Sequence, residues 1–161
     1  MRILCFIVVF LCVKAAMGQG NSFVASDKHF TVNPLTPLVF TYVSADELLE
    51  RKVLPNAFEI KVKAKSSYNV YANIQTATPG GLEFLNDFFL LRLVSMSSQT
   101  ATVTGAEVAL STQPKVLFMQ PAKVNGMEDV SYYYDVIAKP VTTFIKPGSY
   151  NFSIIFTITP Q

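Results

Sequence analysis

His29 is the only histidine of this 161-residue chain, so a catalytic triad that uses histidine would depend on it. It stands in Asp27-Lys28-His29-Phe30, beside the expected start of a strand. The chain contains no G-x-S-x-G, H-E-x-x-H, P-loop or G-x-G-x-x-G motif. We therefore interpret His29 as a surface residue and expect no enzyme activity, no catalytic residues and no cofactor.

The nearest approach to a metal site is Asn125-Gly126-Met127-Glu128-Asp129, with Asp135 beyond it. Carboxylate and amide oxygens beside a glycine suit calcium, but the segment lacks the alternating ligand spacing of an EF-hand loop. Zinc is disfavoured because there is one histidine and the two cysteines lie at positions 5 and 12. We interpret the segment as a solvated turn between strands and predict no metal site.

Lys61, Lys63 and Lys65 alternate with apolar residues and so project from one face of a predicted strand. Tyr71, on the next predicted strand, would lie opposite Lys61 if the two strands form a hairpin. These four residues are the candidate interaction surface. Such a stripe suits nucleic acid or an acidic glycan, but also an ordinary solvent face or an edge strand protected by lysine. No second basic segment supports it, so we predict no nucleic-acid partner.

Residues 1–18 are predicted to be a signal peptide. Arg2 precedes the apolar run Ile3–Val13, and Ala16-Met17-Gly18 places small residues at the positions that a signal peptidase requires. Lys14 ends the run well short of the roughly 20 apolar residues of a membrane span, so an uncleaved anchor is the weaker interpretation. Cleavage after Gly18 would leave a domain of residues 19–161 that has no cysteine and no membrane span.

Loss of the leader also changes the charge. The 13 basic residues of the chain include Arg2 and Lys14, whereas none of its 11 acidic residues lies in the leader. The remaining domain is therefore close to neutral and has no general attraction for nucleic acid. Without disulfides it must be stabilised by packing of its core.

Period-two alternation dominates the rest of the chain and predicts strands. Phe58–Ala64 and Tyr68–Gln75 would form a hairpin around Lys65-Ser66-Ser67, and Tyr150–Thr159 would turn five large apolar residues to the core. Phe88–Leu91 lacks alternation and is expected to be covered on both faces. Further strands are expected at Leu38–Val43, Phe88–Val94, Lys115–Met119, Ser131–Ile137 and, less clearly, Phe23–Ala25, His29–Val32 and Ala101–Thr104.

A short helix is possible after Ser44, because Ser44 and Glu47 fit a capping box and Pro55 would end the helix. Leu82–Asn86 is a second candidate helical turn. Seven to nine strands with turn signals between them predict a single all-β, immunoglobulin-like or pilin-like sandwich.

Three segments resemble exported bacterial β-sandwich domains of the fimbrial-subunit-like type, including DUF4402-like proteins and, more distantly, WxL-type surface domains. They are Phe40–Asp46, Asn56–Val70, and Tyr134–Val136 with Lys146–Thr159. The resemblance implies a fold more than a function. The WxL tryptophans and the cysteine pair of many pilins are absent from the expected domain.

This resemblance implies a secreted structural or adhesive protein of the periplasm or outer surface of a Gram-negative bacterium, acting through protein partners or self-assembly. In fimbrial assembly a strand of one subunit completes the sheet of the next, and Asn21–Val32 is the candidate donor strand. Pairing of this segment within its own sandwich is the alternative. A second functional hypothesis is an extracellular module that binds a glycan or small ligand through Lys61–Lys65 or exposed tyrosines.

Overall fold

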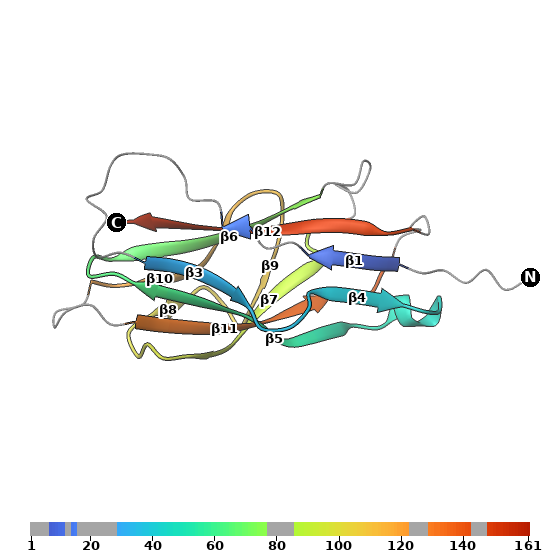
Figure 1. Cartoon of the computed structure of the whole chain (residues 1–161), viewed down its shortest axis with the longest axis horizontal. Coiled ribbons are helices and arrows are strands. Elements are labelled where there is room, and N and C mark those ends of the chain that lie inside the picture. Colours follow the sequence, from blue (N-terminus) through green and yellow to red (C-terminus); the bar gives the residue numbers. More distant parts are fainter. Residues whose placement is uncertain (1–6, 12–13, 16–28, 77–85, 123–128, 143–147) are drawn as a thin grey trace, which may run out of the picture.

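The computed structural model describes residues 7–11, 14–15, 29–76, 86–122, 129–142 and 148–161. They form two β-sheets packed face to face, which confirms the predicted all-β sandwich (Figure 1). Sheet A contains, in order, β4 (Val39–Tyr42), β1 (Ile7–Leu11), β12 (Tyr150–Pro160), β6 (Tyr68–Thr76), β10 (Lys115–Gln120) and β8 (Thr102–Val103), with β2 (Lys14–Ala15) also beside β12. Sheet B contains β3 (His29–Pro34), β5 (Lys52–Lys63), β11 (Asp129–Ala138), β7 (Phe89–Met96) and β9 (Glu107–Ala109).

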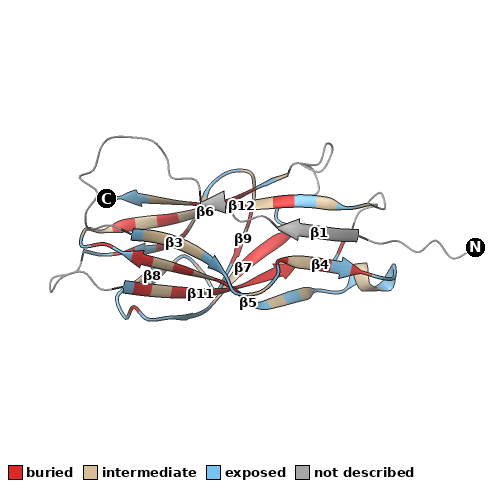
Figure 2. Ribbon diagram, viewed as in Figure 1, coloured by how far each residue is buried: buried red, intermediate tan, exposed pale blue. Residues whose placement is uncertain are grey.

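The core lies between the two sheets and is built from the alternate residues of their strands (Figure 2). On β12, Phe152, Ile154 and Phe156 are fully buried, while Tyr150 and Ile158 pack at its margins. The inward face predicted for this strand is therefore confirmed. The Phe156 ring meets the Phe58 ring of sheet B at a centroid distance of 5.0 Å and so joins the two layers.

The sequence Phe88–Leu91 is buried at all four positions, as its lack of alternation predicts. The three consecutive tyrosines of β11 alternate as expected. Tyr132 and Tyr134 are buried in the core, and Tyr133 lies on the outer face.

The predicted hairpin between Phe58–Ala64 and Tyr68–Gln75 is wrong. β5 pairs with β3 and β11 in sheet B, whereas β6 pairs with β10 and β12 in sheet A. The chain therefore crosses from one sheet to the other between Lys63 and Tyr68. Both strands still turn their apolar residues inward, because each sheet has one face on the same core.

The segment after β4 forms a single 3-10 turn, η1 (Asp46–Leu49), and the chain then enters β5. Half of the predicted capping box is present, since the Ser44 hydroxyl accepts a hydrogen bond from the Glu47 N–H at 3.3 Å. The Glu47 carboxylate accepts instead from the Val43 N–H at 3.2 Å. The helix does not extend to Lys52 because that residue already pairs with Ala138 of β11.

Part of the candidate donor strand pairs within its own sandwich. Residues 29–34 form β3, in which Phe30 pairs with Val62 and Val32 pairs with Ile60 of β5. The expectation that all of Asn21–Val32 is free to donate is therefore wrong for residues 29–32. Residues 21–28, the predicted strand Phe23–Ala25 and most of Leu82–Asn86 lie outside the described residues.

Candidate interaction surfaces

Two lysines of the predicted stripe lie on β5, an inner strand of sheet B between β3 and β11, and the third lies in the connection after it, so the edge-strand interpretation of the stripe is wrong. Lys61 is half-buried on β5 and its Nζ lies 3.4 Å from a carboxylate oxygen of Asp129. Lys63 is exposed at the end of β5, paired with His29 of β3 and Asp129 of β11. Lys65 is exposed in the crossing that follows. The acidic neighbour of Lys61 reduces the basic character of the stripe.

Tyr71 does not join these lysines. It lies on β6 in sheet A, where it pairs with Val116 and Thr157, and its hydroxyl accepts a hydrogen bond from the Asn69 side chain at 3.3 Å. The expectation that Tyr71 lies opposite Lys61 is wrong because the two strands belong to opposite layers. The structure therefore does not bring together the four residues as one surface.

Glu59 is the centre of a polar cluster on the outer face of sheet B that the sequence analysis did not identify. One carboxylate oxygen accepts hydrogen bonds from the Ser131 hydroxyl at 2.6 Å and the Tyr133 hydroxyl at 3.1 Å. The other accepts from the Asn33 amide at 3.1 Å. These donors, with that of Ser131 contributing most, lower the pKa of the Glu59 carboxyl. The cluster ties β3, β5 and β11 together, because Asn33 and Tyr133 pair directly with Glu59 and Ser131 lies two residues before Tyr133 on β11.

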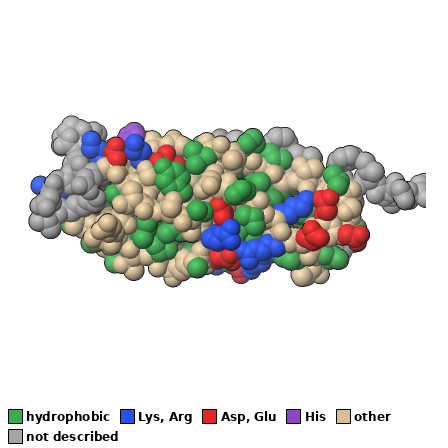
Figure 3. Space-filling view, turned by 90° about the horizontal axis from the view of Figure 1, so that it is seen from below, with side chains coloured by type: hydrophobic (Ala, Val, Ile, Leu, Met, Phe, Trp, Pro, Cys, Tyr) green, Lys and Arg blue, Asp and Glu red, His purple; other side chains and the backbone are tan. Residues whose placement is uncertain are grey.

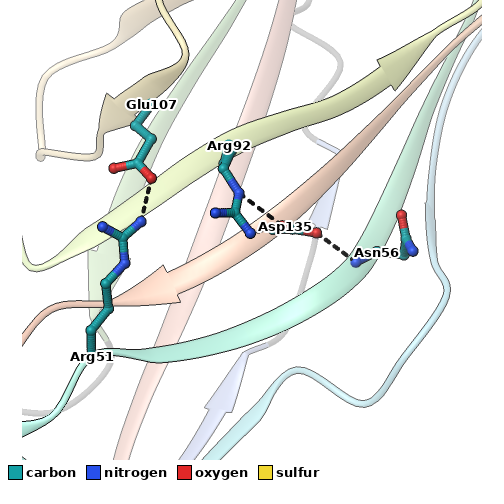
Figure 4. Close-up of polar contacts among 5 residues, drawn as sticks. All are labelled: Arg51, Asn56, Arg92, Glu107 and Asp135. Carbon is teal, nitrogen blue, oxygen red and sulfur yellow. Dashed lines mark hydrogen bonds and ion pairs between the residues drawn. The ribbon is translucent and has the colours of Figure 1, made fainter.

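A second polar cluster crosses the middle of the same sheet (Figure 4). Arg92 of β7 donates from Nε at 3.0 Å and from Nη2 at 2.5 Å to one oxygen of Asp135, which is almost fully buried. The other oxygen accepts from the Asn56 N–H at 2.7 Å. Asn56 has a φ of 46°, and the β5–β11 register shifts beside it. Asp135 therefore stabilises an irregular turn of β5, a role that differs from its considered part in a calcium site.

Arg51 forms an ion pair with Glu107 of β9 next to this cluster. On the face drawn in Figure 3, Lys and Arg side chains lie beside Asp and Glu side chains, and hydrophobic groups are scattered between them. Pairing of opposite charges leaves no field of one sign on this face.

No group of three or more metal-ligating side chains occurs in the part of the chain that the structure describes. Of the considered calcium segment, residues 125–128 lie outside that part, and Asp129 lies on β11. His29 is exposed at the start of β3. Among the described residues, no helix is both long and apolar enough to cross a membrane.

The N-terminal apolar run occupies a place inside sheet A (Figure 1). β1 runs antiparallel to β4, with Ile7 paired to Tyr42 and Val9 paired to Phe40. On its other side it runs parallel to β12, and β2 continues this pairing along the same edge. We call the space that β1 fills between β4 and β12 the β4–β12 slot. The sequence analysis did not predict a strand here, because a short apolar run of this kind is also typical of a leader.

The core beneath the slot is aromatic. Phe40 of β4 and Phe152 of β12 are buried, and both contact Phe89 of sheet B, at centroid distances of 5.7 and 5.2 Å. Tyr42 is also buried, and the Lys52 ammonium lies 4.4 Å from its ring centroid. A strand in the slot therefore covers large apolar side chains as well as backbone groups.

Among the strand pairings of the described residues, β4 pairs with β1 alone. Beside this pairing, the Thr41 carbonyl of β4 accepts a hydrogen bond from Lys52 Nζ at 2.6 Å. β12, by contrast, is paired on its other side with β6 from Phe152 to Pro160. Without β1, both sides of the slot would present unpaired backbone donors and acceptors.

Comparison of the sequence with protein-family models and with curated proteins finds no match to either. What the structure establishes is the two-sheet, all-β sandwich fold.

Proposed function

We propose that this chain is the precursor of a secreted or cell-surface structural or adhesive protein that acts through protein–protein assembly. The observation that carries the proposal is the position of β1 in sheet A, between β4 and β12. Ile7–Leu11 belongs to the leader that the sequence predicts to be removed after Gly18. The mature domain would then lack β1 and the short β2, both of which pair with β12 of sheet A.

A sheet with a missing strand is a binding site for another strand. Main-chain hydrogen bonds supply affinity, and pockets for alternate side chains supply specificity. In this domain the bonds come from the facing edges of β4 and β12, and the apolar floor comes from Phe40, Phe89 and Phe152. Leaving such a surface exposed favours association or aggregation, so its completion by another subunit stabilises an assembly.

The donor that we propose is the mature N-terminal segment of a second copy, residues 19–28. The structure supports a donor that ends before His29, because β3 begins there and is held by β5. Ten extended residues span roughly 33 Å, which exceeds the length of the five-residue β1. The segment includes Phe23, Val24 and Ala25, which can enter an apolar slot.

The sequence resemblance to fimbrial-subunit-like domains supports the same proposal, as does the sandwich fold. A place in the periplasm or on the outer surface of a Gram-negative bacterium follows from that resemblance and from the predicted leader. We propose no reaction, because neither polar cluster of sheet B has the composition of a known catalytic group.

The test compares the solution mass of two chains, residues 19–161 and residues 29–161. We expect the longer chain to form oligomers and the shorter chain to be a folded monomer, since the deletion leaves β3 intact. A monomeric 19–161 chain at all concentrations would contradict assembly and favour the alternative of a glycan- or ligand-binding module. Oligomers of equal size from both chains would show that residues 19–28 are not the donor.

A further inference from the structure

We infer that the leader strand Ile7–Leu11 is an internal placeholder: in the uncleaved chain it completes sheet A and blocks the β4–β12 slot until the leader is removed. This inference rests on the proposed function, because the slot is the site through which we propose assembly. It adds a regulatory step, in which the precursor cannot accept a strand and the processed protein can.

The register of β1 fixes which of its residues pair with core-facing residues of β4 and β12. Val9 pairs with Phe40 on one side and with Tyr150 on the other, and Leu11 pairs with Phe152. Phe40 and Phe152 face the core, and paired residues of neighbouring strands share a face of the sheet. Val8, in contrast, pairs with Thr41, which is exposed. Position 9 is therefore paired with a core-facing residue of β4, whereas position 8 is paired with an exposed one.

The placeholder pairs with the two strands that an incoming subunit would need. Among the described strands, β4 pairs with β1. On the other side, β1 pairs with Tyr150–Phe152 of β12, and β2 pairs with Ile155 and Phe156. A second strand cannot pair with these residues at the same time, because β1 and β2 already occupy that side of β4 and β12. Competition for one set of hydrogen bonds is therefore the physical basis of the block.

The first experiment introduces one charge at each of two adjacent positions of the full chain, produced without export so that residues 1–18 remain. Val9→Asp places a carboxylate on the rung of Phe40, whereas Val8→Asp places it on the rung of exposed Thr41. Because a carboxylate beside the core-facing Phe40 would lose water without gaining a partner, we expect Val9→Asp to lower the folded-to-unfolded ratio on the order of 100-fold, and Val8→Asp to change it less than about tenfold. Equal effects of the two substitutions would overturn the inference.

The second experiment does not depend on the stability of a charged variant. In a full chain with Cys5→Ser and Cys12→Ser, a cysteine pair at Val8 and Thr41 should form a disulfide, because directly paired residues lie within disulfide reach. The control pairs Val8→Cys with Thr102→Cys, on the opposite edge of sheet A, and should not cross-link within one molecule. Absence of the first cross-link, or equal yields of both, would overturn the placeholder strand.

The two proposals can fail separately. If the disulfide forms but the mature chain remains monomeric, the leader strand is real and the assembly function is wrong. If the mature chain assembles but the full chain assembles equally well, assembly stands and the block by the leader is wrong. We expect the full chain to be monomeric when the 8–41 disulfide is formed, and the mature chain to be oligomeric.

Discussion

The ring of Phe89 lies 5.2 Å from the ring of Phe152 between centroids and joins sheet B to the residue of β12 that pairs with Leu11. The same Phe89 ring contacts Phe40 on β4, the other side of the slot. One aromatic residue thus supports both strands that border β1. The slot is for this reason a continuation of the main core.

Phe156→Ala should strongly destabilise the full chain. Its side chain is fully buried and packs on Phe58, so truncation removes apolar contacts and leaves a cavity, at a cost of about 3–5 kcal/mol. Thr157→Ala, one residue later, should cost less than about 1 kcal/mol because Thr157 lies on the outer face of sheet A. Urea unfolding of the two variants gives both values. Similar losses would contradict the inward face assigned to β12.

Asp135→Asn should cost about 1–3 kcal/mol, because it leaves Arg92 without its charged partner while the half-exposed guanidinium can still be hydrated. Asp129→Asn is the control. Asp129 pairs with Lys61 at 3.4 Å and both side chains are largely exposed, so the loss should be below about 1 kcal/mol. A thermal or urea unfolding comparison measures the difference. Equal stabilities would show that the Arg92–Asp135 pair contributes no more than a surface ion pair.

The stability of the fold should decrease above about pH 10. Burial raises the pKa of Tyr42 to about 12, with the negative charge of Glu47 adding to the effect, and burial also raises the pKa values of Tyr68, Tyr132 and Tyr134. The folded state keeps protons that the unfolded chain releases near pH 10, so stability is fully present below that pH and is lost as the pH rises toward the folded pKa values. Urea unfolding midpoints over this range measure the decrease.

Tyr134→Phe provides the control for this pH dependence. The buried Tyr134 hydroxyl has no hydrogen-bond partner among the described residues, so its removal should leave stability at neutral pH unchanged or slightly increased. The loss of stability at high pH should be smaller than in the unaltered chain. Tyrosinate absorbance that develops fully while the fold is retained would contradict burial of these hydroxyls.

Glu59 should make stability decrease at low pH, whereas the buried tyrosines make it decrease at high pH. Its folded pKa is lowered, so its contribution to stability is present above the unfolded pKa of about 4.5 and is lost as the pH falls through the folded pKa. Ser131→Ala removes the hydrogen bond that contributes most and should move the Glu59 pKa back toward its ordinary value. Carboxyl titration followed by nuclear magnetic resonance tests this shift, and an unchanged pKa would rule out Ser131 as its main cause.

Alternation in the sequence predicts the faces of the strands well but does not determine their partners. Val62 and Val70 turn to the core as expected, yet they lie in opposite sheets. Both a hairpin and a crossing place them on the same core. The connection gave the only hint against a hairpin, because Lys65-Ser66-Ser67 lacks the glycine or asparagine that favours a tight hairpin turn.

The candidate sites were harder to predict because they depend on register between distant parts of the chain. Glu59 and Ser131 are separated by 72 positions, and Arg92 and Asp135 by 43. In the sequence, each of these residues is indistinguishable from an ordinary polar residue on the outer face of a strand. The strand Ile7–Leu11 was missed for another reason, since a short apolar run is consistent with both a signal peptide and a buried strand.

The place of β12 in sheet A has a consequence for the order in which the protein can fold. This C-terminal strand lies between β1 and β6 and contributes three fully buried side chains, Phe152, Ile154 and Phe156. β12 follows every other described strand in the chain, so a ribosome, adding about 5–20 residues per second, releases its residues after theirs. Until then sheet A lacks its centre and the core cannot close. The topology therefore delays closure of the core until β12 has left the ribosome, and the strands made earlier must stay separate or unpaired on that side until then.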